Sequence, residues 1–290
     1  MNIEVNRINK GICDNPEKYA IQTNEIFLYQ WKQIAEKIAS NIENRPVILL
    51  AGPSGSGKTT TAFMLTKLLG ELGCGCHTIS MDNYFKSLSD EERELSAQGK
   101  VDLESPDRID KELLNVQIEA IEDCLPIEIP KYDFAKSARS DETKPFERKH
   151  GDAVIFEGIH ALNPDVITVP DSKLYKLYVS VRTRITKEGI VLNPAKIRLM
   201  RRMIRDRNFR KRSLDETMSM YNSVQAGENK YIMPYKTRSD YDIDTFLAYE
   251  MSVYRYNLFD DLRLTENKQE LSDVIEILSS LAPMDNELVP

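Results

Sequence analysis

The pattern of apolar and polar positions predicts short strands and amphipathic helices that alternate along most of the chain. Residues 47–51 and 153–156 are unbroken apolar runs, which is typical of parallel strands covered on both faces. Other strands are predicted at 76–81, 127–132, 174–181 and 241–246. Apolar spacing of three or four predicts helices near 58–72, 109–121, 195–206, 213–229 and 271–281. Strands that alternate with helices indicate an α/β fold with a mostly parallel sheet, in which ligands bind at the carboxyl ends of the strands.

The first 45 residues precede this alternation and are predicted to form an N-terminal extension. Residues 1–24 are weakly patterned, as is the polar and irregular segment 86–107 farther along. Within the extension, one amphipathic helix is predicted from apolar residues three or four apart, namely Phe27, Trp31, Ile34, Ile38 and Ile42. Pro46 is expected to end this helix, because the residue before a proline is pushed out of the helical region. We therefore predict three parts: the extension 1–45, a core 46–265, and a C-terminal helix and tail 266–290.

The segment Gly52-Pro-Ser-Gly-Ser-Gly57-Lys58-Thr59 matches the P-loop pattern G-x4-G-K-[ST]. A buried strand is predicted before it and a helix after it, as a phosphate-binding loop requires. Glycines let successive N–H groups point at phosphate oxygens, and the helix adds its positive N-terminal end. We expect Lys58 to reach the outer phosphates and Thr59 to ligate Mg²⁺. The predicted nucleotide-binding residues are Gly52, Ser54, Gly55, Ser56, Gly57, Lys58, Thr59 and Thr60.

Two carboxylates follow predicted strands that would end beside the P-loop. Asp82 comes directly after the strand 76–81, and Glu157 directly after the strand 153–156. Asp82 could accept a proton from an attacking hydroxyl or hold Mg²⁺, and Glu157 is the expected second acid near the metal. Each acid taken alone would more often be a turn or cap residue. Together with the P-loop, they indicate phosphoryl transfer.

A basic run occupies the region from 198 to 212. Its cations are Arg198, Arg201, Arg202, Arg205, Arg207, Arg210, Lys211 and Arg212, and Asp206 is the acid among them. Helical spacing places Arg198, Arg201, Arg202 and Arg205 on one face. Arginines suit phosphate, so we favour a lid at about 198–215 that closes over a triphosphate. A solvated helix face and a nucleic-acid contact are the alternatives.

Overall composition limits the other function classes. Lys+Arg total 39 and Asp+Glu total 46, which gives a net charge of −7 and does not favour general nucleic-acid binding. No apolar stretch approaches the roughly 20 residues of a membrane span, and the N-terminus does not resemble a signal peptide. No zinc-ligand spacing is found among the cysteines, so we expect reduced thiols and a cytoplasmic location. The four cysteines are Cys13, Cys74, Cys76 and Cys124.

An ordered set of motifs between about 46 and 250 resembles the uridine kinase and phosphoribulokinase family of P-loop kinases. The blocks are the P-loop, Met81-Asp-Asn-Tyr-Phe85, Leu103-Glu-Ser-Pro-Asp-Arg-Ile-Asp110, Pro130-Lys-Tyr-Asp-Phe134 with Arg139, Ala153-Val-Ile-Phe-Glu-Gly-Ile159, the basic run, and 240–250. The resemblance implies a P-loop NTPase-type parallel sheet with an arginine-rich lid and a small acceptor-binding hairpin. It also implies transfer of the γ-phosphoryl of ATP to a hydroxyl, such as the 5′-OH of a nucleoside.

The same resemblance assigns roles to individual residues. It implies Asp82 as catalytic base, with Lys58, Arg202 and Arg205 as catalytic partners, and Arg210 and Arg212 on the nucleotide phosphates. It implies Mg²⁺ ligation by Thr59, Asp82 and Glu157. The acceptor-binding residues that it implies are Asp82, Tyr84, Glu104, Tyr132, Phe134, Arg139 and Ile159.

Three positions depart from the uridine kinase pattern on the acceptor side. Glu104 stands where the family uses Asp, Ser137 where it uses His, and Met220 where it uses Gln. A sugar phosphate, a pantothenate-like molecule or a modified nucleoside therefore stays open as acceptor, as does a nucleotide-dependent ATPase or RNA-associated switch. The extension could pack on its own core or on another subunit of a homo-oligomer.

Overall fold

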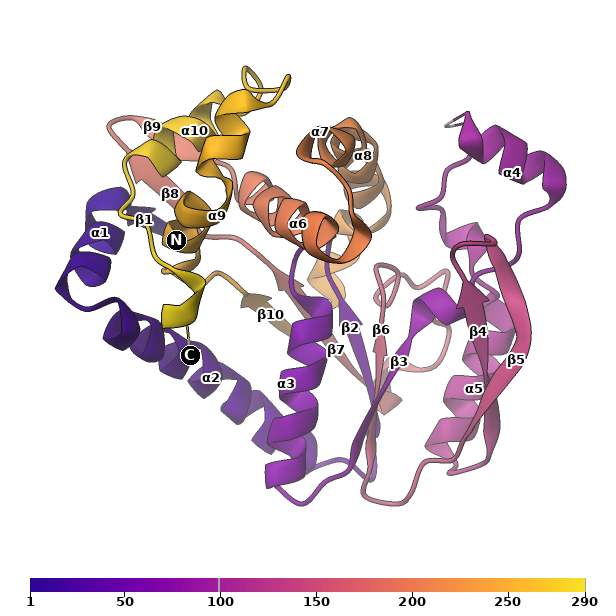
Figure 1. Cartoon of the computed structure of the whole chain (residues 1–290). Helices are drawn as coiled ribbons and strands as arrows, with labels where there is room; N and C mark the ends of the chain where they lie inside the picture. The colour runs from indigo at the N-terminus through magenta and orange to yellow at the C-terminus, as the bar shows by residue number, and fades with distance from the viewer. Residues whose placement is uncertain (99, 290) are drawn as a thin grey trace.

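The computed structural model describes residues 1–98 and 100–289, and a five-stranded sheet forms its centre (Figure 1). The strand order is β10-β7-β2-β6-β3, and every neighbouring pair is parallel. Its strands are β2 (Val47–Ala51), β3 (Cys76–Ser80), β6 (Ala153–Glu157), β7 (Leu174–Ser180) and β10 (Tyr241–Asp244). This order confirms the parallel α/β sheet predicted from the alternation of strands and helices.

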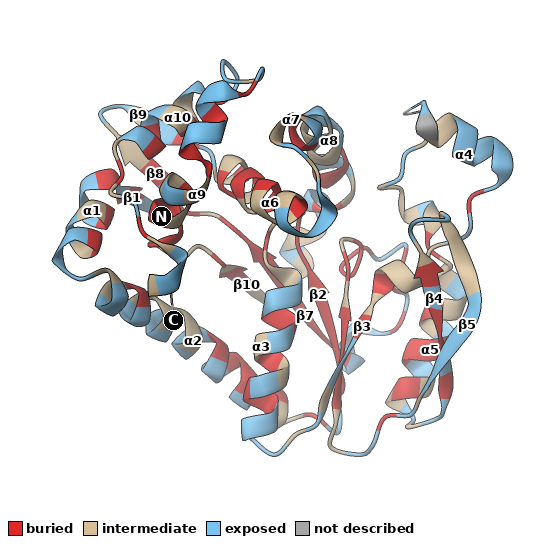
Figure 2. Cartoon of the chain, viewed as in Figure 1, coloured by how far each residue is buried: buried red, intermediate tan, exposed pale blue. Residues whose placement is uncertain are grey.

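Helices cover both faces of this sheet, as the unbroken apolar strands require. Leu49 of β2 packs with α5 (Lys111–Glu122) and the segment 161–169 on one face. Its neighbour Leu50 packs with α2 (Pro16–Ala39) and α3 (Lys58–Glu71) on the other. The central strands β2, β6 and β7 are therefore buried except for Glu157 at the end of β6 (Figure 2), and their carboxyl ends open toward the segment that carries the basic run.

A second core joins the N-terminal segment to the last third of the chain. The strand β1 (Asn2–Glu4) pairs in parallel with β8 (Arg184–Lys187), which pairs antiparallel with β9 (Ile190–Leu192). Apolar residues of four helices pack beside this small sheet. These helices are α1 (Val5–Asp14), α6 (Pro194–Arg210), α9 (Glu250–Leu264) and α10 (Ser272–Ser279).

Several predicted elements differ from the structure. The segment 1–24 forms β1, α1 and the start of α2, because β1 is stabilised by pairing with a strand far along the chain. The segment predicted as irregular contains α4 (Asp90–Ala97), which starts at a capping box of Ser89 and Glu92. The helix predicted at 213–229 is split at Met220 into α7 (Leu214–Ser219) and α8 (Tyr221–Tyr231). Helix α2 ends at Ala39, so Pro46 is not the residue that ends it, contrary to the prediction.

The remaining elements agree with the expected architecture. A hairpin is formed by β4 (Ile127–Asp133) and β5 (Ala138–Phe146), which pair antiparallel at one side of the sheet (Figure 1). Within the described residues, none of the helices combines the length and the apolar character needed to cross a membrane. Residue 290, the end of the predicted C-terminal tail, lies outside the described residues.

Candidate active site

The loop between β2 and α3 has the backbone of a phosphate-binding turn. Gly55 and Gly57 have φ angles of 73° and 88°, which side chains disfavour, and α3 begins at Lys58 directly after them. At Gly52 a Cβ atom would lie 2.1 Å from the carbonyl oxygen of Val179, so only glycine fits there. The N-terminus of α3 therefore opens toward the loop, where its N–H groups can bind an anion.

The predicted metal and phosphate residues lie together at the end of the sheet. The Thr59 hydroxyl lies 3.1 and 3.2 Å from the two carboxylate oxygens of Glu157, which ends β6. The Lys58 ammonium group donates to the carbonyl oxygen of Gly52 at 2.8 Å. Burial lowers the pKa of Lys58, while Glu157 and Asp82 act in the opposite direction. Lys58, Thr59, Asp82 and Glu157 are among the predicted residues that line one cavity of about 690 Å³.

Asp82 lies in the short turn that follows β3 and faces this cavity. The turn begins at Ser80, whose hydroxyl accepts from the Asp82 N–H at 3.4 Å. Burial raises the pKa of Asp82, and the opposing charges of Lys58 and Arg210 reduce that shift. A half-buried carboxylate with a raised pKa beside a P-loop lysine is suited to accept a proton.

Four arginines of the basic run surround one acid, Asp206. This carboxylate is fully buried and lies within 3.1 to 3.8 Å of nitrogens of Arg202, Arg205, Arg210 and Arg212. The same four arginines line the 690 Å³ cavity. Four positive charges around one negative charge leave a strongly positive wall opposite the P-loop. Sequence reasoning treated Asp206 only as an exception in a basic run, although its spacing of four residues from both Arg202 and Arg210 is a local signal of ion pairing on one helix.

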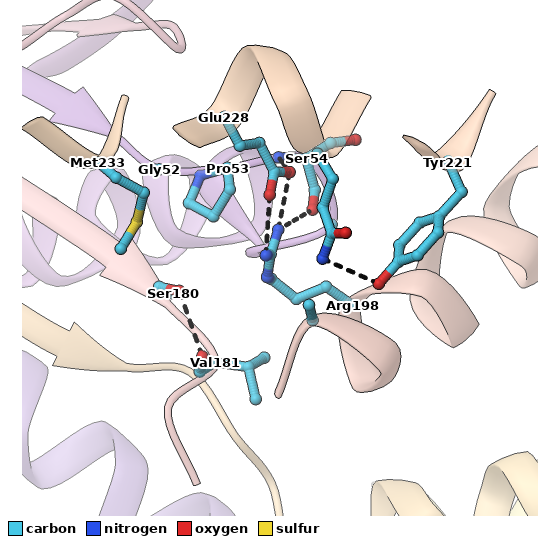
Figure 3. Close-up of polar contacts among 12 residues, drawn as sticks. Gly52, Pro53, Ser54, Ser180, Val181, Arg198, Tyr221, Glu228 and Met233 are labelled. Atoms are coloured by element: carbon cyan, nitrogen blue, oxygen red, sulfur yellow. Dashed lines mark hydrogen bonds and ion pairs between the residues drawn. The ribbon is translucent and has the colours of Figure 1, made fainter. Parts of the chain in front are cut away.

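Arg198 and Arg201 lie on the same helix but hold the P-loop backbone instead. Arg198 donates to the Ser54 carbonyl at 3.1 Å and pairs through two nitrogens with Glu228 at 2.8 and 2.9 Å (Figure 3). Arg201 donates to the Gly55 carbonyl at 3.2 Å and pairs through two nitrogens with Glu250. The helix face that was predicted to form one lid surface therefore has two roles. Arg198 and Arg201 support the P-loop, whereas Arg202 and Arg205 line the cavity.

Part of the acceptor-binding set faces the cavity. Glu104, Phe134 and Ile159 line it, and Phe134 is 65% exposed. Burial raises the pKa of Glu104, and so does the nearby charge of Glu228. His160 was not predicted to belong to the site, yet its Nε2 lies 2.9 Å from the Glu104 carbonyl oxygen. Burial lowers the pKa of His160 to about 4, so its ring is neutral near pH 7.

The structure does not bring Tyr84, Arg139 or Tyr132 to the cavity surface. Tyr84 is fully buried and its hydroxyl donates to Gln117 at 2.7 Å. Arg139 binds Asp110 at 3.0 Å and the Tyr84 carbonyl oxygen at 3.1 Å. The buried ring of Tyr132 meets Phe134 edge-on, with their centroids 5.1 Å apart. These side chains join the hairpin to the end of β3 and hold Phe134 at the cavity.

Of the three residues that depart from the uridine kinase pattern, one lines the cavity and two do not. Glu104 is part of the cavity wall. Ser137 has a positive φ of 49° in the hairpin turn, and Met220 joins α7 to α8 with its sulfur 3.9 Å from Arg202. Neither Ser137 nor Met220 is a lining residue of the cavity.

A parallel sheet with a P-loop at the end of its central strand defines a P-loop nucleotide-binding protein. Residues 47–251 match the model of the phosphoribulokinase/uridine kinase family. The uridine kinase of Lactobacillus helveticus is 34% identical over 199 residues, which are 68% of this chain and 85% of that protein. The uridine kinase of Staphylococcus haemolyticus is 32% identical over 198 residues, or 68% and 86% of the two chains.

Solved structures agree on the fold. A protein from Silicibacter sp. TM1040, described as a candidate fructose transport system kinase, matches with a TM-score of 0.55 at 15% identity and covers 73% of this chain and 98% of that one. YFH7 from Saccharomyces cerevisiae matches with a TM-score of 0.50 at 11% identity, over 76% and 98% of the chains.

The chain belongs to the phosphoribulokinase/uridine kinase family. It is therefore a P-loop kinase, a phosphotransferase that acts on a hydroxyl group. These findings confirm the resemblance seen in the sequence, and the family match covers residues 47–251, which exclude the N-terminal segment.

Proposed function

We propose that this kinase uses ATP to phosphorylate a hydroxyl of a small uncharged molecule, and that its acceptor is a nucleoside phosphorylated at the 5′-OH. One observation carries the proposal: Asp82 faces the same cavity as the P-loop residues Lys58 and Thr59. The relatives named uridine kinase support the nucleoside as acceptor. Glu104 and the other acids of this cavity can accept hydrogen bonds from the hydroxyls of such an acceptor.

The residues present can complete the transfer without a covalent intermediate. The acceptor oxygen bonds to the γ-phosphorus while the bond from that phosphorus to the β–γ bridging oxygen breaks, and ADP leaves with that oxygen. The proton of the acceptor hydroxyl passes to the Asp82 carboxylate. Lys58, Arg202 and Arg205 stabilise the charge that spreads over the transferring oxygens. Arg210 and Arg212 hold the nucleotide phosphates from the opposite wall.

The donor atoms at the P-loop fit a magnesium ion. Mg²⁺ prefers oxygen ligands and is usually held by one or two carboxylates together with phosphates and waters. Thr59, Glu157 and Asp82 supply a hydroxyl and two carboxylates at the right end of the loop. Across the described ranges there is no cluster of three or more His, Cys, Asp or Glu side chains for an ion, so phosphate oxygens would complete the site. When bound, Mg²⁺ supplies positive charge to the phosphates.

An RNA-associated ATPase is supported less well than a kinase. The basic run is divided in the structure: Arg198 and Arg201 pair with Glu228 and Glu250 beside the P-loop. The other four arginines that gather around Asp206 line the cavity that the P-loop also lines, namely Arg202, Arg205, Arg210 and Arg212. These arginines therefore do not present one continuous basic surface.

The test is turnover of the purified full-length protein with Mg·ATP and a panel of acceptors. The panel contains uridine, cytidine, other nucleosides, pantothenate and several sugar phosphates, with ADP release as the first readout and ³¹P NMR of the product as the second. The expected result is ADP release that depends on a nucleoside and yields a 5′-monophosphate. Equal ADP release with and without every acceptor would replace the kinase proposal by the ATPase alternative.

A further inference from the structure

A second cavity, of about 440 Å³, adjoins the P-loop on the side of the N-terminal segment. It shares Lys58 and Thr59 with the first cavity, so a molecule held by the loop can reach both. Beyond the loop, its wall is formed by Phe27, Met64 and Leu247. Two of the charged side chains that line it, Arg201 and Glu250, are paired with each other by hydrogen bonds of 2.8 and 2.9 Å, and a third, Arg205, is paired with Asp206. The part of the wall formed by Phe27, Met64 and Leu247 is apolar, in contrast to the charged wall of the first cavity.

Phe27 comes from α2, which the family match does not include. The half-buried ring of Phe27 meets the buried Trp31 one helical turn later, with centroids 6.3 Å apart and planes inclined by 68°. Trp31 itself packs with α3 and the sheet. Phe27 is therefore held at the edge of the core, with part of its ring turned to the cavity.

A hydrogen bond also fixes α2 to the segment that carries Leu247, another lining residue of this cavity. The hydroxyl of the buried Tyr249 donates to the Asn24 side-chain oxygen at 3.0 Å. Tyr249 lies two residues after Leu247, in the segment between β10 and α9. The bond at Asn24 and the packing at Trp31 thus secure α2 on both sides of Phe27, so this wall exists before any ligand binds.

We propose that this cavity receives the base of the nucleoside triphosphate and that the N-terminal segment completes it through Phe27. This inference rests on the proposed function, because the triphosphate must lie in the P-loop for its base to reach the second cavity. A flat heteroaromatic base gains from an apolar wall that carries an aromatic ring. The extension is then a part of the nucleotide site that residues 47–251 alone do not contain.

The experiment measures binding of Mg·ATP and of Mg·tripolyphosphate, which lacks the base, by isothermal titration calorimetry of the full chain. The variants are Phe27→Ala, Phe27→Tyr, which keeps a ring, and Tyr29→Ala as a matched control on the same helix. Tyr29 is 62% exposed and does not line the cavity. Phe27→Ala is expected to weaken ATP binding about tenfold and leave tripolyphosphate binding unchanged. Phe27→Tyr and Tyr29→Ala are expected to bind ATP like the wild type.

Each other outcome has a distinct meaning. Equal loss of ATP and tripolyphosphate binding in Phe27→Ala would overturn the inference, because Phe27 would then only support the fold. Unchanged ATP binding in Phe27→Ala would overturn it as well, as would wild-type protein that binds ATP no more tightly than tripolyphosphate. Wild-type protein that binds neither ligand would instead remove the proposed function on which the inference depends.

Discussion

The carboxylate of Glu228 accepts a hydrogen bond from the main-chain N–H of Ser54 at 3.0 Å, which places an acid of α8 inside the P-loop (Figure 3). The same carboxylate is paired with Arg198, and both side chains are nearly buried. The loop is thus held in its open shape by an ion pair whose members come from two different helices.

Breaking this pair is expected to destabilise the protein. Glu228→Ala should lower the free energy of unfolding by about 3 kcal/mol, because it leaves the Arg198 charge buried without a partner. Urea unfolding followed by the fluorescence of Trp31 measures this, since Trp31 is the protein's one tryptophan and is buried. The double variant Glu228→Leu/Arg198→Met should lose less than Glu228→Ala. Equal losses in the double and single variants would contradict the coupling.

Replacing Asp82 by Asn is expected to remove proton acceptance without removing the P-loop. We expect kcat to fall by about 10²- to 10⁴-fold, which is the usual contribution of a general base. The dissociation constant of Mg·tripolyphosphate should change little in comparison, because Lys58 and the loop amides are intact. Steady-state turnover and calorimetry on the same preparation separate the two quantities. Turnover at the wild-type rate would discard Asp82 as the base.

The pH dependence of the reaction should report the raised pKa of Asp82. Burial raises this pKa above its ordinary value of 3.8, so the carboxylate becomes protonated, and stops accepting protons, at a higher pH than an exposed Asp would. As the pH falls through that pKa, kcat/KM for the acceptor should decrease about tenfold per pH unit.

The matched control is the pH profile of the residual activity of Asp82→Asn. In this variant the decrease of kcat/KM at low pH should be missing. Glu157 also has a pKa raised by burial, so a decrease that persists in the variant would assign the titration to Glu157 instead.

Asp206 is expected to be a major source of stability although it lines neither of the two cavities. Asp206→Asn should lower the free energy of unfolding by about 3 kcal/mol, because four arginines lose their shared counter-charge. The control is Asp261→Asn, whose carboxylate pairs with Arg207 at 3.1 Å on the exposed surface and should cost less than about 1 kcal/mol. Thermal and urea unfolding compare the free energy of unfolding of the two variants. Similar small losses in both would contradict the prediction, because the four arginines would then be stable side by side without the Asp206 charge.

Much of the framework could be predicted because its signals are local. The strand Val47–Ala51 and the helix that starts at Lys58 were predicted at nearly the observed bounds, since an apolar run, a glycine-rich turn and a helical repeat lie within a few residues of one another. Asp82 and Glu157 were predicted at strand ends for the same reason, because each directly follows a strand predicted from the local sequence. The capping box at Ser89 was a local signal too, and it would have located α4.

Other features were decided by contacts between distant segments. Glu228 lies far along the chain from Ser54, and Phe27 precedes the entire matched region, so neither carries a nearby pattern that shows what it faces. Tyr84 and Arg139 lie in motifs of the family, yet packing turns both away from the cavity. Side-chain direction and long-range pairing depend on how the helices pack around the sheet.

The sequence by itself therefore determined the parallel sheet and the P-loop, because each follows from short-range periodicity or residue type, and its ordered motifs carried the resemblance to a kinase family. Tertiary structure alone decided which charges are paired, how the arginines divide between loop support and cavity wall, and where the N-terminal helix lies. The physical reason is that burial and electrostatics depend on distance in space, which the order of residues fixes only after the chain has folded.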